Sequence, residues 1–336
     1  GERRKGGDAL KPEEPASMLL QIHLILPLAL ILLQLTAVTI ALQDQNEVEE
    51  HAGERRKGRK VKSYKCNCGV PKSFAVNRIL SATETMKNQY PWMVGIYYKN
   101  TTENILYPFC GGVLITDQHL LSTATCGSVL ADAPLESMRI LLGSHNPSLR
   151  NDTQFPRLKR KVKKIVLHPS YTEGSLDYNI AVFTINTPVN LEKRTEIKPI
   201  CISGKPLSNY YGTNAVISGW GRIVADGNPS VVLRHAIIRI LKSAKCEGTA
   251  PAASVCVTDD KTGRIPCPID QGGPMMYQEN NKYVLLGLLP PNDPCEIDTS
   301  PKRLFYTSLP DVQDWVKKQV LSETPGVCSD QAFFLK

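Results

Sequence analysis

From about residue 79 onward, the chain consists of short apolar and β-branched runs separated by clusters of Pro, Gly, Asn and Asp. Eight such runs occupy residues 92–98, 111–115, 138–143, 163–168, 179–185, 214–220, 233–241 and 282–289. Short runs of this composition, bounded by turn-forming residues, predict β-strands. We therefore expect an all-β domain with many short strands, either a barrel or a sandwich.

A single segment near the C-terminus has the spacing of a helix instead. Between residues 309 and 321, with Asp311 near the start, one face carries Leu309, Val312, Val316 and Val320. Apolar residues three or four positions apart line one side of an α-helix. The sequence thus predicts one C-terminal helix that closes the all-β domain.

The N-terminal part has the composition of a secretory leader. Residues 19–41 are almost entirely apolar, follow Met18 and end in the small-residue tripeptide Thr39-Ile40-Ala41. We interpret residues 18–41 as a signal peptide cleaved near Ala41. The alternative is a membrane anchor, because about 20 apolar residues span a bilayer. We favour secretion and expect no stable anchor, since Met18 leaves almost no cytosolic segment.

The residues on either side of this leader carry little apolar sequence. Residues 1–17 lack a starting Met, and we interpret them as translated upstream sequence. A genuine cytosolic tail at this place would favour the membrane anchor again. Residues 42–65 are polar and charged, which predicts a disordered stretch. It belongs to a basic pro-segment, residues 42–78, that contains the C-x-C pair of Cys66 and Cys68.

The chain contains ten cysteines, an even number, behind its hydrophobic leader. In a secreted chain this usage predicts structural disulfides rather than metal ligands or reactive thiols. The isolated C-x-C pair lacks the second pair of ligands that a zinc site needs. We expect neither a metal nor a cofactor.

The net charge is +8, from 40 Lys and Arg against 32 Asp and Glu, and the basic residues cluster at 54–65 and 157–168. Either cluster could bind anionic glycans, lipid headgroups or nucleic acid. We favour solvated, protease-sensitive runs and expect no nucleic-acid partner, because no nucleic-acid motif accompanies the charges. If an anionic glycan binds, the candidate residues are Lys159, Arg160, Lys161, Lys163 and Lys164.

Several motifs resemble the characteristic sequence motifs of the chymotrypsin-like (S1) serine proteases. In family order they are PWMVGIYY at 91, FCGGVLITDQHLLSTATC at 109, DYNIAVFTI at 177, IKPICI at 197, ISGWG at 217, CPIDQGGP at 267 and YTSLPDVQDWV at 306. The resemblance covers about residues 79–321. It implies two packed six-stranded β-barrels with the working cleft between them, in a domain at 79–322 followed by a tail at 323–336.

Catalysis in that family needs a serine nucleophile, a histidine base and an aspartate that orients the histidine. The matching motifs place Thr125 at the histidine position, Asn179 at the aspartate position and Gln271 at the serine position. None of these side chains can take the role that the position requires. The resemblance therefore implies a protein without peptidase activity.

Other positions of the matched motifs depart from the family in the same direction. Ile269 replaces a glycine whose amide helps to form the oxyanion hole, and Ile265 stands at the base of the specificity pocket. Pro290 and Pro291 occupy the strand that pairs with the substrate backbone, where proline cannot donate. Leu304 stands where a small glycine usually lines the pocket wall. These changes imply an obstructed substrate site.

The resemblance also implies a set of disulfides. Cys110 should pair with Cys126, Cys246 with Cys256, and Cys267 with Cys295. Cys201 should hold the pro-segment through Cys66 or Cys68, and the other cysteine of that pair should reach Cys328.

Zymogens of this family are cut after a basic residue, and the new N-terminal ammonium pairs with the aspartate beside the serine. Here Arg78 and Ile79 form the cleavage position, and Asp270 is the expected partner of the Ile79 ammonium. A conformational switch and a relic without function are equally compatible with these residues. Two sequons mark Asn100 and Asn151 as candidate glycosylation sites.

Together these features predict a secreted, non-catalytic serine protease homologue, similar to those of arthropod secretions, saliva and venom. Such a protein would act by binding a protein partner, as cofactor or regulator of an active protease or as a decoy for protease inhibitors. The alternatives are a ligand or polyanion binding module and a residual serine-type endopeptidase.

Overall fold

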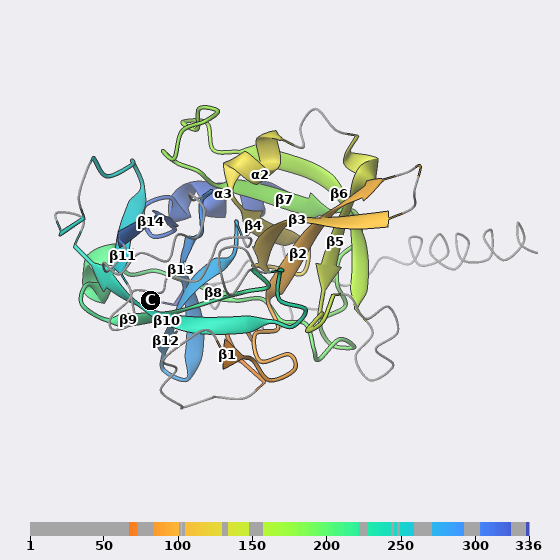
Figure 1. Cartoon of the computed structure of the whole chain (residues 1–336), viewed down its shortest axis with the longest axis horizontal. Coiled ribbons are helices and arrows are strands. Elements are labelled where there is room, and N and C mark those ends of the chain that lie inside the picture. Colours follow the sequence, from red (N-terminus) through yellow and green to blue (C-terminus); the bar gives the residue numbers. More distant parts are fainter. Residues whose placement is uncertain are drawn as a thin grey trace, which may run out of the picture. The chain divides into compact units, whose positions relative to one another are not determined.

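The computed structural model describes residues 67–72, 83–100, 102, 105–129, 134–147, 157–221, 228–242, 245–246, 249–258, 271–291, 303–323 and 334–335. All of them belong to one compact unit that spans residues 63–336 (Figure 1). The predicted signal peptide, most of the pro-segment and most of the C-terminal tail lie outside the described residues.

The first barrel is a closed sheet of six antiparallel strands. In spatial order these are β2 (Met93–Asn100), β3 (Ile105–Leu114), β4 (His119–Ser122), β7 (Ala181–Ile185), β6 (Leu158–Leu167) and β5 (Met138–Leu142). Pairing of β5 with β2 closes the ring. The short 3-10 helix η1 (Leu135–Ser137) leads into β5.

A second ring of six antiparallel strands follows in the chain. Its order is β12 (Pro274–Glu279), β9 (Asn214–Gly219), β10 (Arg234–Leu241), β11 (Ser254–Thr258), β14 (Arg303–Ser308) and β13 (Lys282–Leu288), closed by pairing of β12 with β13. Three short strands extend this sheet: β8 (Cys201–Ser203) beside β13, β15 (Phe334–Leu335) beside β8, and β1 (Thr83–Glu84) beside β10. The 3-10 helix η2 (Leu207–Tyr210) lies between β8 and β9.

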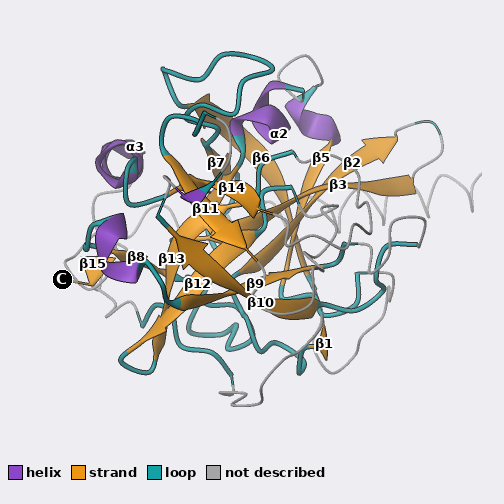
Figure 2. Cartoon of the chain, turned by 60° about the vertical axis from the view of Figure 1, so that its left-hand side comes forward, coloured by secondary structure: helices purple, strands orange, loops and turns teal. Residues whose placement is uncertain are grey.

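The predicted C-terminal helix is present as α3 (Gln313–Glu323), drawn in purple in Figure 2. The four apolar residues expected on one face, Leu309, Val312, Val316 and Val320, are all buried. The helix begins at Gln313, because residues 309–312 form a turn in which Val312 N donates to Leu309 O. The fold class is therefore confirmed: two six-stranded barrels and one C-terminal helix.

A continuous core joins the two barrels. Trp92 is fully buried, and its Nε1 donates to the sulfur of Met276 at 2.9 Å. Tyr90 and Tyr283 pack around the Trp92 ring with centroid separations of 6.0 and 5.7 Å. Because Trp92 precedes the first barrel while Met276 and Tyr283 belong to the second, burial of this cluster fixes the barrels against each other.

Candidate functional site

The short helix α2 (Ala124–Ser128) positions the first candidate residue, Thr125. Thr123 caps this helix in an extended conformation, and its hydroxyl accepts from Cys126 N. A disulfide joins Cys126 to Cys110 on β3. Capping and disulfide together hold α2 at the end of β4, with the Thr125 side chain half-buried.

Asn179 lies just before β7 and is fully buried. Its Oδ1 accepts from Thr125 N at 2.9 Å, and its Nδ2 donates to Thr125 Oγ1 at 2.8 Å. Its backbone oxygen accepts from the Thr307 hydroxyl on β14, at 3.1 Å. Asn179 thus joins α2 of the first barrel to a strand of the second.

Gln271 begins the described segment that leads into β12. Its backbone oxygen accepts from Gly111 N at 2.8 Å, and its side-chain Nε2 donates to Thr123 Oγ1 at 3.1 Å. The next residue, Gly272, has φ +88, and a Cβ there would lie 2.4 Å from Gly111 O. Only glycine fits this close approach, which presses Gln271 against the residue that caps α2.

The three predicted positions therefore lie around the start of α2. Thr125 and Asn179 bond to each other directly, and Gln271 bonds to Thr123, two residues before Thr125. A hydroxyl and two carboxamides have no proton equilibrium near neutral pH. Such a group can position and hydrogen-bond, but it contains no general base and no activated nucleophile.

Each of the four described histidines is engaged elsewhere. Their hydrogen-bond partners are Thr116 for His119, Glu84 and Thr85 for His145, Ser170 N for His168, and Tyr90 for His235. Burial lowers the pKa of His168 and of His235. These contacts give the four histidines structural roles within the two barrels.

The structure describes three of the five positions expected to obstruct the substrate site. Pro290 and Pro291 follow the end of β13, and Pro290 is buried. Leu304 lies opposite Val257 in the pairing of β11 with β14 and packs against the core of the second barrel. Ile265 and Ile269 lie outside the described residues, so their roles stay predictions.

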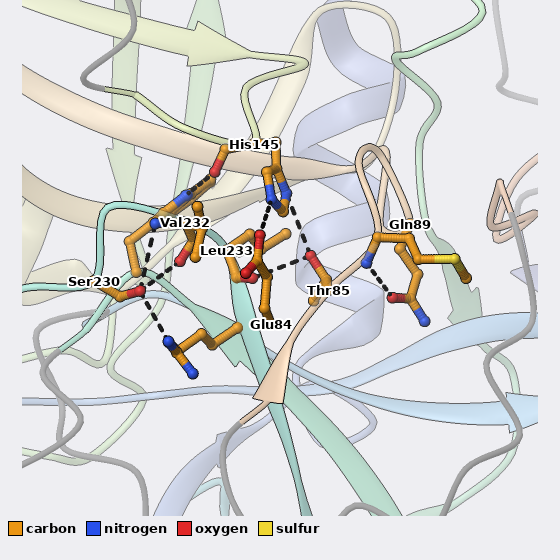
Figure 3. Close-up of polar contacts among 10 residues, drawn as sticks. Glu84, Thr85, Gln89, His145, Ser230, Val232 and Leu233 are labelled. Carbon is orange, nitrogen blue, oxygen red and sulfur yellow. Dashed lines mark hydrogen bonds and ion pairs between the residues drawn. The ribbon is translucent and has the colours of Figure 1, made fainter.

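The predicted cleavage residues Arg78 and Ile79, and their partner Asp270, also lie outside the described residues. The segment that follows them is held firmly (Figure 3). Thr85 N and the Thr85 hydroxyl both donate to Leu233 O, at 2.9 and 3.1 Å. His145 Nε2 lies 3.1 Å from Glu84 Oε1. The other ring nitrogen, His145 Nδ1, lies 3.5 Å from the Thr85 hydroxyl oxygen. A loop of the first barrel thereby contacts β1, which pairs with the second barrel.

The described part of the pro-segment, residues 67–72, is attached to the second barrel. Cys68, rather than Cys66, pairs with Cys201. Beside it Gly69 N donates to Pro199 O and Gly69 O accepts from Tyr283 N. A cut after Arg78 would therefore leave residues 67–72 attached to the second barrel.

The structure also describes a further disulfide and one of the two sequons. A third disulfide joins Cys246 to Cys256, as the resemblance implies. Asn100 lies at the end of β2, where its Oδ1 accepts from Thr102 N. Asn151, Cys66, Cys267, Cys295 and Cys328 lie outside the described residues.

The described residues contain neither a candidate metal site nor a candidate membrane span. No cluster of three or more His, Cys, Asp or Glu residues could hold a metal ion there. Within the same ranges, no helix has the length and apolarity needed to cross a membrane.

Comparison with known proteins agrees with this geometry. The family model for trypsin matches residues 79–316. The chain is 26% identical to rat transmembrane protease serine 9, over 78% of this chain and 24% of that protein. It is 25% identical to the cattle suppressor of tumorigenicity 14 protein homolog, over 75% of this chain and 29% of that protein.

A third relative is closer in length. The chain is 27% identical to cattle chymotrypsin-like elastase family member 1, over 73% of this chain and 90% of that protein. By contrast, it spans only about a quarter of the length of the first two relatives. With the family model covering most of the chain and the two barrels in place, this chain belongs to the trypsin family of serine protease domains.

Proposed function

We propose that this trypsin-family protein does not hydrolyse peptides and acts by binding another protein, as a regulator of an active protease. The observation that supports the proposal is the pair of hydrogen bonds between Thr125 and Asn179. These two residues satisfy each other, where a working site would need a base and the carboxylate that orients it.

The chemistry of the third position supports the same proposal. A carboxamide nitrogen delocalises its lone pair and is a poor nucleophile, so Gln271 cannot replace a serine. Its Nε2 is already engaged with Thr123 Oγ1. The Thr125 hydroxyl accepts from Asn179 and lies 3.4 Å from the Tyr171 hydroxyl, and neither group is a base near neutral pH.

We further propose that the protein works outside the cell. The leader at 18–41 and the three disulfides among the described residues fit an oxidising compartment. The three relatives described above come from rat and cattle. The similarity to arthropod secretions, saliva and venom stays a prediction.

Peptidase activity can be tested on the full secreted chain, before and after cleavage at Arg78. We expect neither cleavage of a peptide library nor labelling by a fluorophosphonate probe, while bovine chymotrypsin-like elastase gives both. Peptide cleavage that Thr125→Val abolishes and Ser128→Ala retains would overturn the proposal.

The regulatory role needs a separate measurement. Adding the cleaved and uncleaved protein to active trypsin-family proteases should change kcat/KM for at least one of them, and binding should depend on the cut at Arg78. Equal affinity of both forms would exclude a cleavage-dependent switch. Tight binding to a substrate-like trypsin inhibitor would instead favour the decoy role, which Pro290 and Pro291 oppose because they cannot donate to an inhibitor's backbone.

A further inference from the structure

Strand β6 of the first barrel carries a dense row of exposed positive charge. Its apolar residues Leu158 and Val162 are buried in the barrel, whereas Lys159, Lys161, Lys163 and Lys164 are all exposed. In a regular strand alternate residues point to opposite sides of the sheet. Alternation explains the outward position of Lys159 and Lys161, but it cannot place both Lys163 and Lys164 in solvent.

A β-bulge places the two adjacent lysines in solvent. Val162 lies opposite Ile185 on β7, yet Lys164 lies opposite the neighbouring Thr184, so the register shifts between them. Without this extra residue Lys164 would follow Val162 toward the barrel interior. A bulge redirects side chains in this way and is a built feature rather than a defect. Four lysines within six residues therefore point to solvent.

Further positive groups border this row. Arg139 on β5 lies directly opposite Lys161, and like charges opposed across a strand pair are destabilising. The Arg139 guanidinium is fixed in place, because it donates to Met138 O at 2.8 Å. Arg160 donates to Thr187 O at 3.0 Å, and burial together with the charge of Arg194 lowers the pKa of Arg160.

Two acidic residues at this end of the barrel contact arginines rather than the lysines of β6. Arg194 pairs with Glu196 at 3.1 Å, and that carboxylate is largely buried. Glu136 contacts Arg139 through its backbone oxygen. A bound anion would relieve the repulsion between Arg139 and Lys161, which the fold otherwise tolerates.

We propose that Arg139, Lys159, Lys161, Lys163 and Lys164, the basic face of β6, bind a linear sulfated polysaccharide of the glycosaminoglycan type. At about 3.3 Å per residue, the row from Lys159 to Lys164 is roughly 16 to 17 Å long. This length matches several successive sulfates on an extended chain rather than a single small anion. The inference adds a partner to the proposed function and rests on its extracellular location.

Other polyanions fit this face less well. Single-stranded nucleic acid is bound by stacking of bases on aromatic side chains beside the basic groups. Strand β6 itself contains no aromatic side chain. The residues between its lysines are Arg160 and Val162, and the strand ends in Ile165, Val166 and Leu167. An acidic peptide would need only charge, so it serves as the competing outcome of the test.

The test measures binding of the full secreted protein to immobilised heparin between 50 and 200 mM salt. With five ionic contacts, one from each of these basic residues, the affinity should fall about 500-fold over this range, since each contact contributes about 0.9 to the slope of log affinity against log salt. A variant with Lys159, Lys161, Lys163 and Lys164 changed to Ser should lose at least tenfold in affinity and most of the salt slope.

A matched control removes the same charge elsewhere. Its four exposed lysines are Lys87, Lys242, Lys245 and Lys318, each changed to Ser. We expect it to bind heparin within about twofold of the unchanged protein. Two double variants, Lys159→Ser with Lys161→Ser and Lys163→Ser with Lys164→Ser, should each lose about half the slope, which tests the site even if the fourfold variant folds poorly.

Three outcomes would overturn the inference. Equal losses in the β6 variant and the control would show that net charge alone causes retention. Polyglutamate that binds as tightly as heparin would indicate an acidic-peptide surface, and tighter binding of single-stranded DNA would indicate a nucleic-acid surface. None of these results affects the peptidase assay, so the proposed function and this inference fail independently.

Discussion

Asp117 places a buried carboxyl group in the turn between β3 and β4 of the first barrel. The residue is 8% exposed, and in the described part of the structure its Oδ1 has no hydrogen-bond partner. Burial raises the pKa of Asp117 to about 6, although a backbone hydrogen bond opposes part of the rise. The folded protein therefore disfavours the ionised form of this side chain.

The raised pKa predicts how stability depends on pH. The folded-state pKa lies above the ordinary value of 3.8 for an aspartate, so the contribution of Asp117 to stability is most favourable below about pH 4. Stability is then lost as the pH rises through 6. The difference is about two pKa units, and at 1.36 kcal/mol per unit it amounts to about 3 kcal/mol above pH 7. Asp117→Asn removes the charge at similar volume and should recover this free energy at pH 7.5 but not at pH 4.

The assay is urea unfolding under non-reducing conditions, followed by tryptophan fluorescence from pH 4 to pH 8. The difference in unfolding free energy between Asp117→Asn and the unchanged protein should grow across the range and level off above pH 7. The exposed Glu173→Gln serves as the control and should stay within about 0.5 kcal/mol. A difference that is absent, or constant with pH, would refute the reasoning.

Three further predictions concern the site and the packing. Asn179→Ala leaves the N–H and hydroxyl of Thr125 without their partner and should lower the unfolding free energy by about 2–4 kcal/mol in urea; a loss below 0.5 kcal/mol would contradict the pairing. Gly272→Ala forces a Cβ toward Gly111 O at a positive φ, so we expect a drop in Tm or in secreted yield, and an unchanged Tm would count against this geometry. Val316→Ala on the buried face of α3 should cost about 2 kcal/mol in the same urea assay, whereas a neutral result would mean that the helix packs loosely.

Much of the fold could be predicted from the sequence, because strand formation follows the local alternation of apolar and polar residues and the positions of turn-forming residues. The eight apolar runs correspond to β2, β3, β5, β6, β7, β9, β10 and β13. Strand β6 begins five residues earlier than the run at 163–168, because three basic residues lie there between the buried Leu158 and Val162 and hide the apolar pattern. Strand β8 has only three residues, and it pairs in parallel with the distant strand β13. A segment this short has no local pattern from which a strand could be predicted.

The residues at the three positions of the candidate site could also be identified from the sequence. The motifs around Thr125, Asn179 and Gln271 are local, and each substitution can be read within a few residues of the family's frame. The chemistry that these side chains lack follows from their identity alone. What Ile265, Ile269 and Asp270 contribute stays at that level of prediction.

Tertiary structure decided what these side chains do instead. The bonds between Thr125 and Asn179 join residues 54 positions apart, and the bond from Gln271 to Thr123 spans 148 positions. The choice of Cys68 over Cys66 as partner of Cys201 is likewise a contact across 133 residues.

For the lysines of β6, too, the sequence determines one part and the tertiary structure another. Their number and order are written in the sequence, but the bulge that exposes both Lys163 and Lys164 depends on pairing with β7. Composition and local pattern determine which groups a protein of this kind possesses. Which of them meet is decided only when distant segments pack, because packing places together side chains that no local pattern relates.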